Sequence, residues 1–163
     1  MVAEHGDAPH ALGPLVLRRS MVHPVQSRMM ALAVLAALLA PLAVAGGLEP
    51  DEHGVGTHRQ LGMSSCALLV LTGVPCPTCG MTTACALAVR GRWMASLRTQ
   101  PAGCLLAASL MIGALVTVAG LMTGNVWSIN WFRVRPLWAA AGAVLFFIAA
   151  WGYKIIAVRN AAG

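Results

Sequence analysis

The sequence predicts an all-α integral membrane protein with four transmembrane helices, the second of which is broken at a Cys-Pro-Thr-Cys-Gly motif. Of the 163 residues, 58% are hydrophobic and only 10% are charged, whereas about a quarter are charged in a soluble globular domain. So few charged side chains cannot cover a surface that faces water, and the apolar side chains must face lipid. The net charge of +6 comes from short basic groups between apolar runs, a pattern typical of membrane topology signals rather than of nucleic-acid binding.

The first 28 residues predict a disordered basic tail, because they contain Gly, Pro, three His and three Arg without a sustained hydrophobic period. A single transmembrane helical domain follows over residues 29–159. Its first span is the uncharged run 29–47, which is long enough to cross a hydrocarbon core of about 30 Å. A competing interpretation is a cleaved secretory signal, since Ala43-Val44-Ala45 has the small-x-small pattern of a cleavage site.

The second span is expected at about residues 64–89, after an exposed acidic loop over residues 48–60. No residue from 61 to 89 is charged, but helix-breaking residues interrupt the run in its middle. They are Gly73, Pro75, Pro77 and Gly80. The run therefore predicts two half-helices around a break.

The third and fourth spans are expected at about residues 102–122 and 137–156. Lys154 lies near the end of the fourth span, from which its side chain is expected to snorkel toward water. Trp151 and Tyr153 are expected at the membrane interface of the same end.

The distribution of Arg and Lys discriminates between two paths of the broken segment. If this segment crosses the membrane, eight basic residues lie on one side and three on the other. If it turns back, the split is five against six, and the usual cytoplasmic excess of basic residues is lost. Crossing is favoured, with both termini on the cytoplasmic side of the membrane.

The motif places Cys76 and Cys79 three residues apart, near enough for a disulfide or for a shared metal ion. Pro77 suits the first position of a helix, which would make Cys76 the N-cap and expose its sulfur to the positive end of the helix dipole. That position lowers a thiol pKa, whereas burial near the middle of the membrane raises it. Residues expected to support the motif are Pro75, Pro77, Gly80, Thr82 and Arg90.

Three interpretations of the cysteine pair stay open. Cys76 and Cys79 are small packing residues, or the catalytic pair of a thiol-disulfide oxidoreductase, or ligands of a metal ion such as zinc. Cys66 and Cys85 also lie nearby, but Cys85 would fall on another side of a helix that begins at Pro77. Two chains that share Cys76 and Cys79 would therefore build a four-thiolate site more easily than one chain.

Other candidate sites carry less weight. All five acidic residues precede residue 53, so a pair of catalytic carboxylates is not expected. His53, His58 and Asp51 form a metal-site pattern, but solvated loop histidines are far commoner. The basic segment 90–98 is expected to anchor the chain at the membrane surface rather than to bind a specific lipid.

The segment Thr72–Ala84 reads Thr-Gly-Val-Pro-Cys-Pro-Thr-Cys-Gly-Met-Thr-Thr-Ala, and Arg90-Gly91 and Gln100-Pro101 follow it. Over residues 72–103 the chain resembles the domain of unknown function 2752, a family of short bacterial membrane proteins with a Cys-Pro-x-Cys-Gly-x-Thr-Arg core. Thr83 stands where that family usually has Arg, and Gln100 stands where it usually has Asn. The resemblance implies a bacterial membrane location and an important cysteine pair, but no activity.

Taken together, the sequence predicts a non-enzymatic membrane interaction or accessory module centred on Cys76 and Cys79. The expected partners are the lipid bilayer, a second copy of the chain or another membrane protein, and not nucleic acid. No cofactor is expected, apart from zinc under the metal-binding interpretation. The alternatives are a membrane thiol-disulfide oxidoreductase and a thiolate metal-binding protein.

Overall fold

The structure is a computed structural model that describes residues 16–20, 24–129 and 136–162. The rest of the predicted N-terminal tail lies outside these residues. The described elements, in chain order, are β1 (Val16–Ser20), α1 (Pro24–Gly47), the 3-10 helix η2 (Thr57–Leu61), α2 (Ala67–Thr72), α3 (Met81–Val89), α4 (Trp93–Thr99), α5 (Pro101–Thr123), β2 (Asn125–Ile129) and α7 (Pro136–Ala162).

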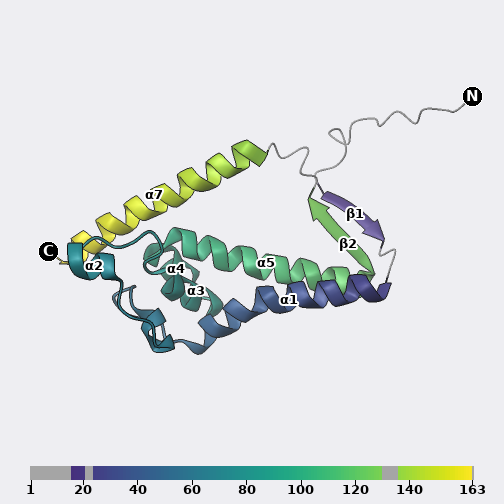
Figure 1. Cartoon of the computed structure of the whole chain (residues 1–163), viewed down its shortest axis with the longest axis horizontal. Helices are drawn as coiled ribbons and strands as arrows, with labels where there is room; N and C mark the ends of the chain where they lie inside the picture. The colour runs from purple at the N-terminus through teal and green to yellow at the C-terminus, as the bar shows by residue number, and fades with distance from the viewer. Residues whose placement is uncertain (1–15, 21–23, 130–135, 163) are drawn as a thin grey trace, which may run out of the picture.

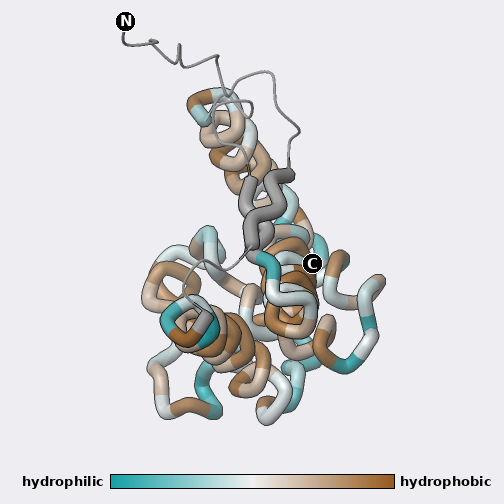
Figure 2. Tube along the Cα trace, turned by 90° about the vertical axis from the view of Figure 1, so that its right-hand side faces the viewer, coloured by the Kyte–Doolittle hydropathy of each residue, from teal (hydrophilic) through white to brown (hydrophobic). Residues whose placement is uncertain are grey.

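Three of the helices are long and apolar enough to cross a membrane, namely α1, α5 and α7. They correspond to the first, third and fourth predicted spans, although α1 begins at Pro24 and α7 continues to Ala162. Most of their large apolar side chains are exposed, as expected for helices that face lipid. Hydrophobic residues, coloured brown, recur along the long helices (Figure 2). The structure is thus compatible with a membrane-embedded protein.

The predicted total of four spans is not confirmed, because the segment expected to form the second span folds as two short helices. Helix α2 has six residues and ends at Gly73, whose φ of 70° closes the helix in the left-handed region. Helix α3 has nine residues, about 14 Å of helix, and cannot cross a core of about 30 Å. Pro75 and Pro77 lie between them, where they prevent one continuous helix.

The segment instead turns back to the end from which it started. Helices α1 and α5 pack antiparallel, with Leu38 against Gly113 and Leu42 in one cluster with Ala107. The residues between them, 48–100, therefore lie at one end of the long helices, together with the C-terminal end of α7 (Figure 1). We call residues 48–100 the cap. If α1, α5 and α7 each cross the membrane, the chain crosses three times, and the predicted cytoplasmic placement of both termini is not shown.

Helix α3, which is part of the cap, packs against the long helices α1 and α5 through small residues. Ala88 packs against Leu42 of α1 and Ala107 of α5. A Cβ added to Gly103 of α5 would lie 2.9 Å from the Cβ of Ala84, so glycine is needed for this close approach. Small residues that let backbones approach closely are typical of helix contacts in membranes.

A short antiparallel strand pair lies at the other end of the molecule, and the other described elements are helices, as predicted (Figure 1). Strand β1 pairs with β2, with Val16 opposite Ile129 and Ser20 opposite Asn125. The sequence predicted no regular structure at residues 16–20. The pairing joins segments more than one hundred residues apart, and no local periodicity in either segment indicates it.

Candidate functional site

The Cys-Pro-Thr-Cys-Gly motif forms a turn rather than the start of a helix. The amide of Cys79 donates to the carbonyl oxygen of Cys76 at 3.0 Å, and that of Met81 donates to the oxygen of Thr78 at 3.1 Å. Helix α3 begins only at Met81, with Gly80 as its N-cap. The prediction of Pro77 as the first helical residue, with Cys76 as the N-cap, is therefore wrong, and the motif lies in the cap, at one end of the long helices.

Cys66 joins the two motif cysteines to form a group of three thiols. The sulfur atoms of Cys66, Cys76 and Cys79 all lie within 4.8 Å of one another. Within the group, the sulfur atoms of Cys76 and Cys79 are 3.2 Å apart. Cys66 lies directly before the short helix α2, and the turn with Cys76 and Cys79 follows this helix. The turn brings its two thiols back beside Cys66. One chain therefore assembles three thiols without a second copy.

The three thiols have different environments. Cys66 makes no capping hydrogen bond to α2, but the approach of the Leu69 backbone amide lowers its pKa to about 7. Burial raises the pKa of Cys79 to about 12, and its neighbour Cys76 adds to the increase. Of these two thiols, Cys66 is therefore the more acidic.

Cys85 and Cys104 lie away from this group. The thiol of Cys85 faces the carbonyl oxygen of Gly103 at 3.5 Å, and burial raises its pKa. The structure thus agrees with the expectation that Cys85 does not share a site with Cys76 and Cys79.

Two side chains from other helices hold the backbone on either side of Cys76. The indole of Trp151 on α7 donates to the carbonyl oxygen of Pro75 at 2.8 Å. The side-chain amide of Gln100 donates to the carbonyl oxygen of Pro77 at 3.1 Å. These carbonyls precede and follow the first motif cysteine, so the turn is tied to α7 and to the start of α5.

Gly80 is required for both its conformation and its surroundings. Its φ is 86°, and a Cβ at this position would lie 2.6 Å from the carbonyl oxygen of Gly54. The ammonium nitrogen of Lys154 would lie 3.0 Å from the same Cβ. Lys154 does not extend to water as the sequence predicted: it is only 3% exposed and donates to the carbonyl oxygens of Gly54 and Thr99, each at 3.0 Å.

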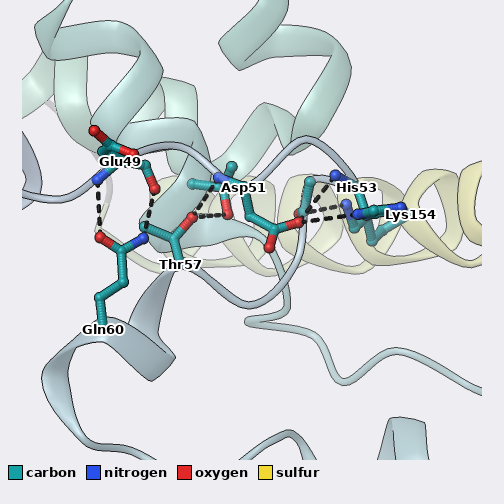
Figure 3. A network of polar contacts seen from close by, with 8 residues as sticks. Glu49, Asp51, His53, Thr57, Gln60 and Lys154 are labelled. Atoms are coloured by element: carbon teal, nitrogen blue, oxygen red, sulfur yellow. Dashed lines mark hydrogen bonds and ion pairs between the residues drawn. The ribbon is translucent and has the colours of Figure 1, made fainter.

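The loop before α2 has its own polar network (Figure 3). The hydroxyl of Thr57 accepts from the amide of Asp51 at 3.0 Å and lies 2.8 Å from the hydroxyl of Thr83. Glu49 and Gln60 exchange two hydrogen bonds between backbone and side chain. Thr57 and Thr83 are buried, so this network fixes the loop on α3. The contact on α3 is made by Thr83, the residue after the predicted support residue Thr82.

Arg90, which the sequence predicts to support the motif, contacts the ends of two helices. Its guanidinium donates to the carbonyl oxygens of Ala45 at 3.4 Å, Gly46 at 3.1 Å and Ala86 at 3.0 Å. The first two belong to the last turn of α1, where carbonyl oxygens lack the usual intrahelical donors, and that of Ala45 also accepts from the amide of Leu48 at 3.4 Å. Arg90 thereby connects the end of α3 to the end of α1.

Sequence reasoning missed the structural roles of Trp151 and Lys154. Both were expected at a membrane interface on the basis of residue type, and no local pattern indicates that they contact the cap. Cys66 was noticed only as one of four neighbouring cysteines. Its spacing of ten residues from Cys76, across a break at Gly73, is compatible with a short helix and a return turn.

Among known proteins, neither the curated proteins nor the solved structures contain a match to this chain. One family model matches residues 66–114, from Cys66 into the second half of α5, and its description is "Protein of unknown function (DUF2752)". The matched region contains all three thiols, the turn, Gln100 and Arg90. Residues 66–114 of this chain are thus similar to the DUF2752 family of proteins of unknown function, which confirms the resemblance that the sequence predicted.

Proposed function

We propose that the chain is a membrane-anchored metal-binding protein in which Cys66, Cys76 and Cys79 hold a thiophilic ion such as Zn²⁺. The observation that carries this proposal is the approach of three sulfur atoms to within 4.8 Å of one another. A Zn–S distance of about 2.3 Å in tetrahedral geometry puts two sulfur ligands about 3.8 Å apart. That value lies between the 3.2 Å that separates the sulfur atoms of Cys76 and Cys79 and the upper limit of 4.8 Å for all three sulfur atoms.

The surrounding charge also favours a metal–thiolate group. Three thiolates and one divalent ion carry a net charge of −1, which is costly to bury without a counter-charge. The buried ammonium of Lys154 lies beside Gly80, the residue after Cys79. A cation at this position offsets the negative charge of the occupied site.

The proposal keeps the non-enzymatic role that the sequence favoured. The acidic side chains that the structure describes, at residues 49–52, form no pair directed at the thiols. On the basis of the family resemblance, we place the protein in a bacterial cytoplasmic membrane. There it acts as an accessory module that contacts a second copy or another membrane protein through its exposed helices.

Titration of the reduced protein with Co²⁺ in detergent tests the metal site. Wild type is expected to bind one ion per chain, with intense sulfur-to-cobalt charge-transfer absorption in the near ultraviolet. Cys66→Ser, Cys76→Ser and Cys79→Ser should each weaken or abolish this absorption, whereas Cys104→Ser, outside the group, should leave it unchanged. Wild-type protein without cobalt–thiolate absorption would contradict the proposal.

A second candidate function is thiol-disulfide exchange, which the sulfur distance of 3.2 Å between Cys76 and Cys79 favours. Oxidation of these two thiols to a disulfide releases two electrons and two protons, which a quinone in the bilayer would accept to become a quinol. Cys66, with its lowered pKa, is placed to attack the disulfide.

Thiol trapping distinguishes the two functions. Membranes are treated with a permeant alkylating reagent with and without prior reduction, and Cys76 and Cys79 are quantified by mass spectrometry. The metal-binding function predicts reduced thiols that a zinc chelator makes reactive. A Cys76–Cys79 disulfide whose fraction follows the redox state of the quinone pool would support exchange instead.

A further inference from the structure

We infer that His58 supplies the fourth ligand, through Nδ1, to the metal ion held by Cys66, Cys76 and Cys79. This inference rests on the proposed metal-binding function. Structural zinc sites are almost always four-coordinate, and three cysteines with one histidine form a common ligand set. The three thiols alone leave one position of a tetrahedron open.

His58 shares a cleft with two of the three cysteines. The cleft has a volume of about 180 Å³, and His58, Cys66, Cys79 and Gly80 contribute to its lining. It also contains Arg59 and Ser65. A guanidinium has no lone pair for a metal, and zinc prefers imidazole to a neutral hydroxyl. His58 is therefore the best additional ligand in the cleft lining.

The hydrogen bond of the His58 ring leaves the required nitrogen free. Nε2 lies 3.2 Å from the carbonyl oxygen of Ser64. A carbonyl oxygen only accepts, so Nε2 carries the proton and Nδ1 of the neutral ring has the lone pair. Histidines that bind metals usually donate their second ring N–H to a carbonyl or carboxylate, which fixes the tautomer.

The same bond ties His58 to the segment that carries a thiol. Ser64 precedes Cys66 by two residues, so the ring and the Cys66 sulfur move with one short stretch of backbone. Among the residues that the structure describes, the close group of ligand atoms contains only the three sulfurs. Ligation therefore requires the His58 ring to move into the adjacent cleft together with the Ser64 carbonyl oxygen that fixes its tautomer, while buried Thr57 holds the backbone of η2 on α3.

His53 is the natural comparison, since it is the other histidine of the same loop. Its side chain is 88% exposed, and its Nδ1 lies 3.7 Å from the carboxylate of Asp51. It does not line the cleft that contains Cys66 and Cys79. His53→Ala is therefore a matched control for substitutions of His58.

The test compares Co²⁺ binding by the full-length protein in detergent, under reducing conditions, for wild type, His58→Ala, His58→Cys and His53→Ala. We expect His58→Ala to keep the sulfur-to-cobalt absorption, to shift the visible d–d bands and to bind at least about 10-fold more weakly. His58→Cys should restore tight binding and add charge-transfer intensity, which a merely structural role would not produce. His53→Ala should match wild type.

The outcomes separate the inference from the function on which it rests. If His58→Ala binds Co²⁺ with the d–d bands and the affinity of wild type, the inference that His58 is a ligand is overturned. The proposed thiolate site would be unaffected by that result. Weak binding by His58→Ala that His58→Cys does not rescue would also overturn it. No cobalt–thiolate absorption in wild type would overturn both proposals.

Discussion

The ammonium nitrogen of Lys154 lies 3.0 Å from the carbonyl oxygen of Gly54, one hundred residues away in the sequence. The same nitrogen donates to the carbonyl oxygen of Thr99, also at 3.0 Å. A lysine near the end of α7 thus joins the loop before α2 to the end of α4. The contact has consequences for stability and for membrane topology.

Replacing Lys154 by Met should destabilise the protein. Methionine keeps an unbranched apolar chain but leaves the oxygens of Gly54 and Thr99 without their donor, and a buried unpaired polar group costs about 1–3 kcal/mol. The free energy of unfolding, measured by denaturation in mixed detergent, should fall by this amount. Arg159→Gln, which changes an exposed charge on the same helix, is the control and should stay within about 0.5 kcal/mol of wild type. Equal stability of both variants would contradict the contact.

The same contact predicts that the loop at residues 48–66 and the C-terminus lie on one side of the membrane. A four-span chain would put them on opposite sides, because the segment 64–89 would then cross between them. Protease protection of one epitope tag inserted after Gly62 and another at the C-terminus, in spheroplasts and in inverted vesicles, measures the two sides. The structure places nothing within 4 Å of a Cβ on Gly62, so an insertion there should be tolerated. Opposite sides for the two tags would restore the four-span topology.

Gly80→Ala should be strongly destabilising. The left-handed conformation costs an alanine about 1–2 kcal/mol, and the added Cβ would also lie 2.6 Å from the backbone oxygen of Gly54. Thermal unfolding and cobalt affinity should both decrease, because the turn must move away from the loop. Gly142→Ala is the matched control on α7, where a Cβ meets nothing within 4 Å, and it should not lower stability. A Gly80→Ala variant as stable as Gly142→Ala would count against this arrangement of the turn.

The thiols should differ in their pH dependence of alkylation in metal-free, reduced protein. The pKa of Cys66 is lowered to about 7, so its thiolate fraction rises with pH and should reach one half near pH 7. Burial raises the pKa of Cys79 to about 12, and this thiol should react slowly throughout pH 6–9. Rates for each cysteine, measured by mass spectrometry at a series of pH values, provide the comparison. A Cys66 profile with its midpoint near the ordinary thiol value would show that the Leu69 amide has no effect.

The sequence by itself determined the membrane class, the long helices and the location of the thiol chemistry. These follow from local properties: uninterrupted apolar runs have the length of a bilayer core, and Pro and Gly around Cys76 prevent a continuous helix. The same local information indicated that Cys85 would not join the motif cysteines. The family resemblance also depended on residues that are adjacent in the chain.

Only the tertiary structure decided where the broken segment goes and which residues surround the thiols. Crossing and turning back are equally compatible with an apolar run that contains a break, and the choice depends on packing of Ala84 and Ala88 against α5 and α1. Trp151 and Lys154 form hydrogen bonds to the cap, and Cys66 approaches the turn. Each of these contacts joins residues whose separation in the sequence leaves no periodic signal. Side-chain type and spacing predict local conformation. These contacts instead arise because the arrangement of the long helices α1, α5 and α7 brings one end of α7 onto residues 48–100.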